Sequence, residues 1–65
     1  MAHKIGELVE VQVNGVTLIA EVESEASANG ELEVVFQDTY YDKNGNLAAY
    51  DRYVFVDEDE VHTLF

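Results

Sequence analysis

The sequence contains no cysteine and no proline. The absence of cysteine excludes disulfide bonds and thiolate zinc sites, so neither can supplement the core of a chain of 65 residues. A chain of this length buries only about 60% of the surface that its unfolded form exposes. We therefore expect a single domain over residues 1–65 with a stability of a few kcal/mol, to which oligomerisation could add buried area.

Positive charge is also scarce. The chain has only three basic residues (Lys4, Lys43 and Arg52) against 14 acidic ones, which gives a net charge of −11. A nucleic-acid-binding protein needs cations to displace the counterions of phosphates, so we expect no direct binding to DNA or RNA and none to anionic membranes. A basic protein partner is electrostatically favoured. In an alternative interpretation, the charge serves only solubility or adaptation to a salty cytoplasm.

Long apolar runs are missing, although 48% of the residues are hydrophobic. This composition is typical of a globular protein, and no segment is long enough to span a bilayer. The first residues, 1–6, lack the basic start and apolar centre of a signal peptide. We therefore predict a soluble, cytoplasmic protein.

Alternating apolar residues on both sides of Asn14-Gly15 predict a β-hairpin. Asn-Gly is typical of a type I′ turn, in which both central residues need a positive φ. A two-residue turn fixes the register, and every predicted pair on one face is then apolar, so the turn and the pattern agree. These pairs are Val13 with Val16, Val11 with Leu18 and Val9 with Ala20.

A second hairpin is predicted after the polar loop 24–30. Its first strand begins at Glu31 and continues to about Tyr41, and its second covers residues 47–56. Residues 42–46 form the turn, with Gly45 in the left-handed conformation. The apolar pairs predicted on one face are Val34 with Val54 and Leu32 with Val56. Three tyrosines gather near the tip of this hairpin: Tyr40, Tyr41 and Tyr50.

An acidic segment, residues 57–60, interrupts the alternation. Asp57 is a suitable N-cap, and the length favours one 3₁₀ turn. Residues 61–65 then predict a short final strand.

The order of hairpin, loop, hairpin, 3₁₀ turn and short strand resembles that of the SH3-like small barrels. The resemblance implies an all-β fold in which five antiparallel strands form a small barrel, with a 3₁₀ turn before the last strand. It rests on element order over nearly the whole chain. The first loop, Asn14-Gly15, is too short to be the long acidic loop of peptide-binding SH3 domains, so their function is not implied. The alternative architecture is an open antiparallel sheet that dimerises through one face.

No group of residues predicts catalysis, and we expect no enzyme, no cofactor and no metal site. Residues 42–46 resemble the start of an EF-hand loop, but Leu47 stands where that loop needs Gly and Tyr53 where it needs Glu. The two histidines, His3 and His62, are isolated. The glycines are dispersed as turn residues and form no phosphate-binding loop.

The candidate binding surface lies on the reverse side of the sheet. If Val22 pairs with Leu32, Ile19 lies beside Val35 and Val35 beside Tyr53, with Phe55 one step along. The acidic residues around this stripe are Glu10, Glu21, Glu33 and Asp51. An apolar, aromatic stripe with an acidic rim is typical of a protein-binding or self-association site. Alternatively, the stripe is a second core covered by the terminal segments (Ile5, Leu64 and Phe65).

The sequence thus favours a non-catalytic protein-binding module. Its most specific form is an acidic inhibitor or nucleic-acid mimic, whose carboxylates replace phosphates on a basic protein partner. One alternative is a homo-oligomeric structural or accessory subunit, such as a homodimer, that uses the stripe as its interface. Another is a designed scaffold without biological function, with which the regular alternation is compatible.

Overall fold

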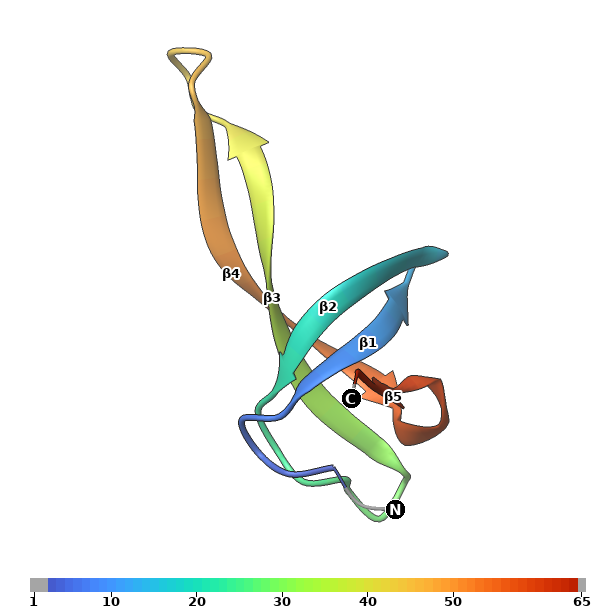
Figure 1. Cartoon of the computed structure of the whole chain (residues 1–65). Coiled ribbons are helices and arrows are strands. Elements are labelled where there is room, and N and C mark those ends of the chain that lie inside the picture. The colour runs from blue at the N-terminus through green and yellow to red at the C-terminus, as the bar shows by residue number, and fades with distance from the viewer. Residues whose placement is uncertain (1–2, 65) are drawn as a thin grey trace.

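The computed structural model describes residues 3–64 and shows five strands and one short 3₁₀ turn (Figure 1). In chain order these elements are β1 (Leu8–Val13), β2 (Val16–Val22), β3 (Glu31–Tyr41), β4 (Leu47–Asp57), the 3₁₀ turn η1 (Glu58–Glu60) and β5 (His62–Thr63). The predicted all-β class and the 3₁₀ turn before the last strand are confirmed. No helix within residues 3–64 is long and apolar enough to cross a membrane.

The strands form a single antiparallel sheet in the order β4-β3-β2-β1-β5. Within residues 3–64 the sheet is not closed, because β4 and β5 remain its two edges. The predicted SH3-like barrel is therefore not confirmed. The two hairpins diverge because β2 pairs with β3 only at Glu21–Val35 and Val22–Val34. In Figure 1 the β3–β4 hairpin consequently extends well away from the β1–β2 hairpin.

The first hairpin has the register that its turn predicts. Asn14 and Gly15 both have positive φ, 51° and 80°, as a type I′ turn requires. Local turn chemistry therefore fixes which apolar side chains of β1 and β2 face the core. The three predicted pairs are all present: Val13 with Val16, Val11 with Leu18 and Val9 with Ala20.

The second hairpin is longer and runs without interruption from the pair Glu31–Asp57 to the pair Tyr41–Leu47. Its predicted apolar pairs are confirmed, and Gly45 has a φ of 82° in the turn. The Asp42 carboxylate accepts the N–H groups of Asn44 and Asn46 at 2.8 and 2.9 Å, which fixes that turn. Residues 37–51 lie beyond the buried core, and we call this part of the hairpin the arm.

The arm makes the molecule elongated. Its principal extents are 45 × 24 × 22 Å and its radius of gyration is 13.1 Å, whereas a compact chain of this length is expected to have about 11 Å. A two-stranded hairpin is marginally stable by itself, so the arm depends on the body of the sheet at its base.

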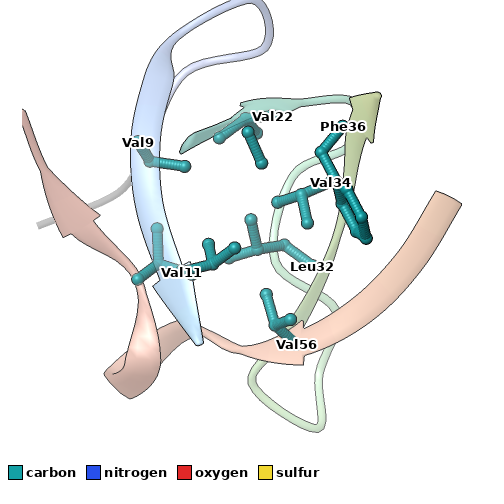
Figure 2. Packing of buried hydrophobic residues seen from close by; sticks show 9 residues of the cluster. Val9, Val11, Val22, Leu32, Val34, Phe36 and Val56 are labelled. Carbon is teal, nitrogen blue, oxygen red and sulfur yellow. The ribbon is translucent and has the colours of Figure 1, made fainter. Parts of the chain in front are cut away.

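One apolar cluster forms the core, on the concave side of the sheet (Figure 2). Its buried members are Val9, Val11, Ala20, Val22, Leu32, Val34, Phe36, Val56 and Val61. Val61 joins the last segment to the core directly after the 3₁₀ turn, which explains why the chain returns there. Val16 is on the predicted core face but is 54% exposed, because it lies at the end of the first hairpin, away from the second.

The register between β2 and β3 differs from the prediction. Val22 pairs with Val34 and not with Leu32. The connecting loop explains the shift, because the Ser24 hydroxyl accepts the N–H of Glu33 at 3.0 Å. The loop also contains its own turn, in which the N–H of Gly30 donates to the carbonyl of Ser27 at 2.9 Å. A shift of two residues leaves each side chain on its predicted face.

The end of the described chain departs from the prediction in two details. Asp57 occupies the N-cap position of η1, but its side chain makes no capping hydrogen bond. The final strand is shorter than predicted, since only His62 and Thr63 pair with β1. Phe65, to which the prediction extended, lies outside the described residues.

Candidate partner-binding surface

The outer face of the sheet, opposite the core, carries a row of side chains contributed by four strands. Leu8 of β1 pairs with Glu21 of β2, Glu21 pairs with Val35 of β3, and Val35 pairs with Tyr53 of β4. The row exists because alternation places every second residue of each strand on this side. It crosses the sheet where β2 and β3 are still paired.

A groove of about 350 Å³ lies over this row, where β2 and β3 begin to separate. We call it the outer groove. Its apolar side chains are Leu8, Ile19, Val35 and Tyr53, and its polar ones include Glu21, Glu23, Gln37 and Asp51. An apolar floor with carboxylates at its margin can accept an apolar side chain and a cationic one together.

The apolar side chains of this face are accessible. Ile19 is 64% exposed, Tyr53 57% and Phe55 68%, and Val35 is partly buried. Within residues 3–64, therefore, the terminal segments do not bury the stripe as a second core. Ile5 is itself exposed, and Phe65 lies outside the described residues.

The predicted site residues share this face, but their neighbours differ in part from the prediction. Val35 lies beside Tyr53 as predicted. The prediction that Ile19 lies beside Val35 is wrong, because the shifted register places Glu21 there. Ile19 still borders the outer groove, one step along β2.

Of the remaining predicted residues, only Asp51 lines the groove. Glu10 pairs with Ile19, and Asp51 pairs with Gln37 at the base of the arm. Phe55 pairs with Glu33 on the same face but does not line the groove. Phe55 therefore extends the apolar surface along β4.

Two groove residues, Glu23 and Gln37, were absent from the sequence-based site. Glu23 follows β2, and its N–H donates to the carbonyl of Glu33 at 2.8 Å, which continues the shifted register. The two serines of the loop were the signal in the sequence, because Ser side chains accept local backbone N–H groups in turns.

Positive charge lies away from the outer face. Arg52 is on the opposite face of β4, where its Nη1 is 3.1 Å from Oδ2 of Asp38 and its guanidinium carbon 5.8 Å from the centroid of the Phe36 ring. The N–H of Thr39 and the guanidinium of Arg52 lower the pKa of Asp38. Asp38 therefore pairs with Arg52 and keeps the positive charge of Arg52 away from the groove carboxylates.

The tyrosines of the arm make ordinary cross-strand contacts. Tyr40 and Tyr50 meet edge to face with ring centroids 5.7 Å apart. The Tyr50 hydroxyl lies 3.4 Å from the Asp38 carboxylate. Tyr41 is 75% exposed at the tip. These contacts stabilise the arm, and Tyr40 and Tyr50 lie on the face opposite the outer groove.

The histidines are well separated. His3 Nδ1 lies 2.9 Å from Oε2 of Glu7, while His62 is an exposed residue of β5, as predicted. Within residues 3–64, no three His, Asp or Glu side chains are placed to hold a metal ion together.

No protein-family model, curated protein or solved structure matches this chain. Its function is therefore inferred from the surface described above.

Proposed function

We propose that this chain is a non-catalytic binding module that engages a basic protein through the outer groove and the carboxylates around it. The observation that carries the proposal is the exposure of Ile19, Tyr53 and Phe55 on one face of a very small protein. Large exposed apolar side chains that gather on one face mark interaction sites more often than neutral surface. Aromatic side chains at the centre of such a face are typical of binding hot spots.

Charge determines the class of partner. Glu21, Glu23 and Asp51 line the groove, and the nearest cation of β4, Arg52, is engaged on the opposite face. A partner with Lys or Arg around an apolar side chain would complement this surface. In the inhibitor form of the proposal, the partner is a nucleic-acid-binding protein, and the carboxylates occupy the place of phosphates.

A test compares two double variants, each of which replaces one exposed aliphatic and one exposed aromatic side chain by Ser. Ile19→Ser with Tyr53→Ser alters the outer groove, whereas Leu47→Ser with Tyr41→Ser removes an exposed aliphatic and an exposed aromatic side chain at the tip of the arm. Affinity capture from the source organism's lysate at low and high salt is read by mass spectrometry. We expect a basic protein that wild type and the tip variant retain at low salt, and that the groove variant loses. Capture that is insensitive to both salt and the groove variant contradicts the proposal.

Self-association is the second candidate for this face, because a small domain gains stability from oligomerisation. The net charge of −11 opposes it, since two copies would bring like charges together. Sedimentation at increasing protein concentration distinguishes the two candidates: a monomer at high concentration excludes self-association. The resemblance to SH3-like barrels and the cytoplasmic location stay predictions, and the proposed binding does not depend on either.

A further inference from the structure

The edge strand β4 has only one of the features that protect an edge from pairing with another chain, the charged side chains of Asp51, Arg52 and Asp57. Natural edge strands are commonly short, bulged, or interrupted by Pro or Lys. β4 has 11 residues, contains neither Pro nor Lys, and pairs with β3 without a bulge. It is also an outermost strand of the sheet within residues 3–64. Its outer side is therefore a long row of backbone groups available for hydrogen bonding.

Two flanking hydrogen bonds show which backbone groups these are. The N–H of Glu58 donates to the carbonyl of Gly30 at 2.8 Å, and the N–H of Asp42 donates to the carbonyl of Asn46 at 2.9 Å. Both bonds belong to the register that pairs β3 with β4. Because hydrogen-bonded and non-bonded pairs alternate in an antiparallel ladder, the even-numbered residues of β4 bond to β3. The odd-numbered ones direct their N–H and C=O groups to the free edge.

These edge-directed residues are the same ones whose side chains lie on the outer face. Tyr53 borders the outer groove beside Val35, Asp51 lines the same groove, and Phe55 continues the face. A strand that bonds to this edge would thus place every second side chain next to Asp51, Tyr53 and Phe55. Backbone pairing and side-chain recognition would occur at the same three residues.

We infer that β4 is the docking edge for an extended, basic segment of the partner, which adds to the sheet as a further strand over residues 49–55. The edge serves the same basic partner as the outer groove, and so rests on the proposed function. In strand addition, main-chain hydrogen bonds supply affinity and alternate side chains supply specificity. Lys or Arg side chains at alternate positions lie on the outer face, beside the Asp51 carboxylate and the rings of Tyr53 and Phe55.

The net charge favours a basic segment of a partner at the β4 edge over a second copy of this chain. A second β4 at this edge would bring together two acidic strands from molecules that each carry a net charge of −11. A basic segment reverses the sign of that interaction. The C-terminal end of β4, from Val54 to Asp57, borders a groove of about 240 Å³ that it shares with Val13 and Asn14 at the end of β1.

The test uses a capped nine-residue peptide in which Lys and Val alternate, with the wild-type protein and with the two double variants. One derivative carries N-methyl groups on the Lys amides, and a matched derivative carries them on the Val amides. When the peptide pairs antiparallel to β4 with its Lys side chains on the outer face, the Lys amides point at β4. Only the first derivative then loses the backbone hydrogen bonds. We expect it to bind about tenfold more weakly or worse, while the Val-methylated peptide binds like the unmodified one.

Amide exchange measured by NMR gives an independent readout. The amides of Asp51, Tyr53 and Phe55 should exchange more slowly when the unmodified peptide is bound. If both methylated peptides bind equally and the groove variant still weakens them, strand addition is wrong while the proposed function stands. If the Lys–Val peptide binds no better than a peptide with Ser in place of every Lys, both are wrong. A dimer protected at these amides without peptide would show that a second copy occupies the edge and would overturn the inference.

Discussion

Arg52 determines where positive charge lies on the two longest strands, because β3 and β4 contain no other cation. Alternation places it on the core side, where it stacks against Phe36 and pairs with Asp38. The exchange of this single residue with either neighbour along β4 would bring the cation to the outer face. The outer groove thus stays acidic because Arg52 stands at a position of β4 whose side chain faces the core side.

Glu7 links the start of the described chain to β5. One of its carboxylate oxygens lies 2.9 Å from Nδ1 of His3, the other accepts the N–H of Lys4 at 3.1 Å, and the Thr63 hydroxyl lies 3.5 Å away. The hydrogen bond with His3 is the largest cause that lowers the pKa of Glu7 below its ordinary value of 4.5. A lowered pKa in the folded state means that the carboxylate stabilises the fold above about pH 4.5.

That stabilisation is lost as the pH falls through the lowered pKa of Glu7. We expect the His3→Ala variant to lose less stability than wild type between about pH 5 and pH 3. Thermal melts across this range test the difference, with His62→Ala as a control because His62 is exposed. Equal losses in wild type and His3→Ala would contradict the role assigned to the pair.

The two hairpins use the same turn chemistry but differ in what supports them. Gly15 and Gly45 both have positive φ, 80° and 82°, with open space where a Cβ would be. An Ala at either position therefore costs about 1–2 kcal/mol of backbone strain without a steric clash. The first hairpin ends near the core, whereas Gly45 lies at the tip of the arm.

We expect Gly15→Ala to lower the free energy of global unfolding by about 1 kcal/mol or more, because that hairpin supplies core residues on both strands. Gly45→Ala should change it less, since the arm can open locally while the core stays folded. Urea denaturation followed by circular dichroism measures the first effect, and amide exchange in the arm detects the second. Equal shifts of the global transition would show that arm and core unfold as one unit.

Much of each hairpin was predictable because local signals agree. The Asn-Gly turn and the apolar alternation independently specify Val11 opposite Leu18, and the second turn and its strands specify Val35 opposite Tyr53. The neighbour of Ile19 was not predictable from alternation. A shift of two residues between β2 and β3 keeps every face unchanged, and the choice depends on hydrogen bonds of Ser24 and Ser27 within a short loop.

At the scale of the whole molecule, closure into a barrel was the least predictable property. Closure depends on how far two hairpins remain paired, and here they pair at only two positions, Glu21–Val35 and Val22–Val34. Nothing in the alternation of β2 or β3 marks where that pairing stops. Whether the outer face stays accessible depends on where the segments before β1 and after β5 run. The alternation within the strands does not indicate this path.

Net charge gives a prediction for the whole fold. With a net charge of −11, repulsion among carboxylates destabilises the compact state, and salt screens it with a Debye length of about 8 Å at 0.15 M. We expect the melting temperature to rise by a few °C between 10 mM and 300 mM NaCl. A variant with Asp59→Asn and Glu60→Gln should rise less, because it removes two exposed charges of η1. A flat or falling salt series would contradict this expectation.

The uninterrupted ladder of the arm also restricts how its length can change. Insertion of one residue into each strand at the base of the arm would rotate everything beyond it to the opposite face, so that Tyr40 and Tyr50 would exchange sides with Tyr41 and Leu47. Two residues per strand preserve the faces and lengthen the arm by about 7 Å. Variants of this chain that keep the same surfaces should therefore differ in arm length by multiples of four residues in total, two in each strand. The distance between the core and the tip of the arm can thus change only in increments of about 7 Å.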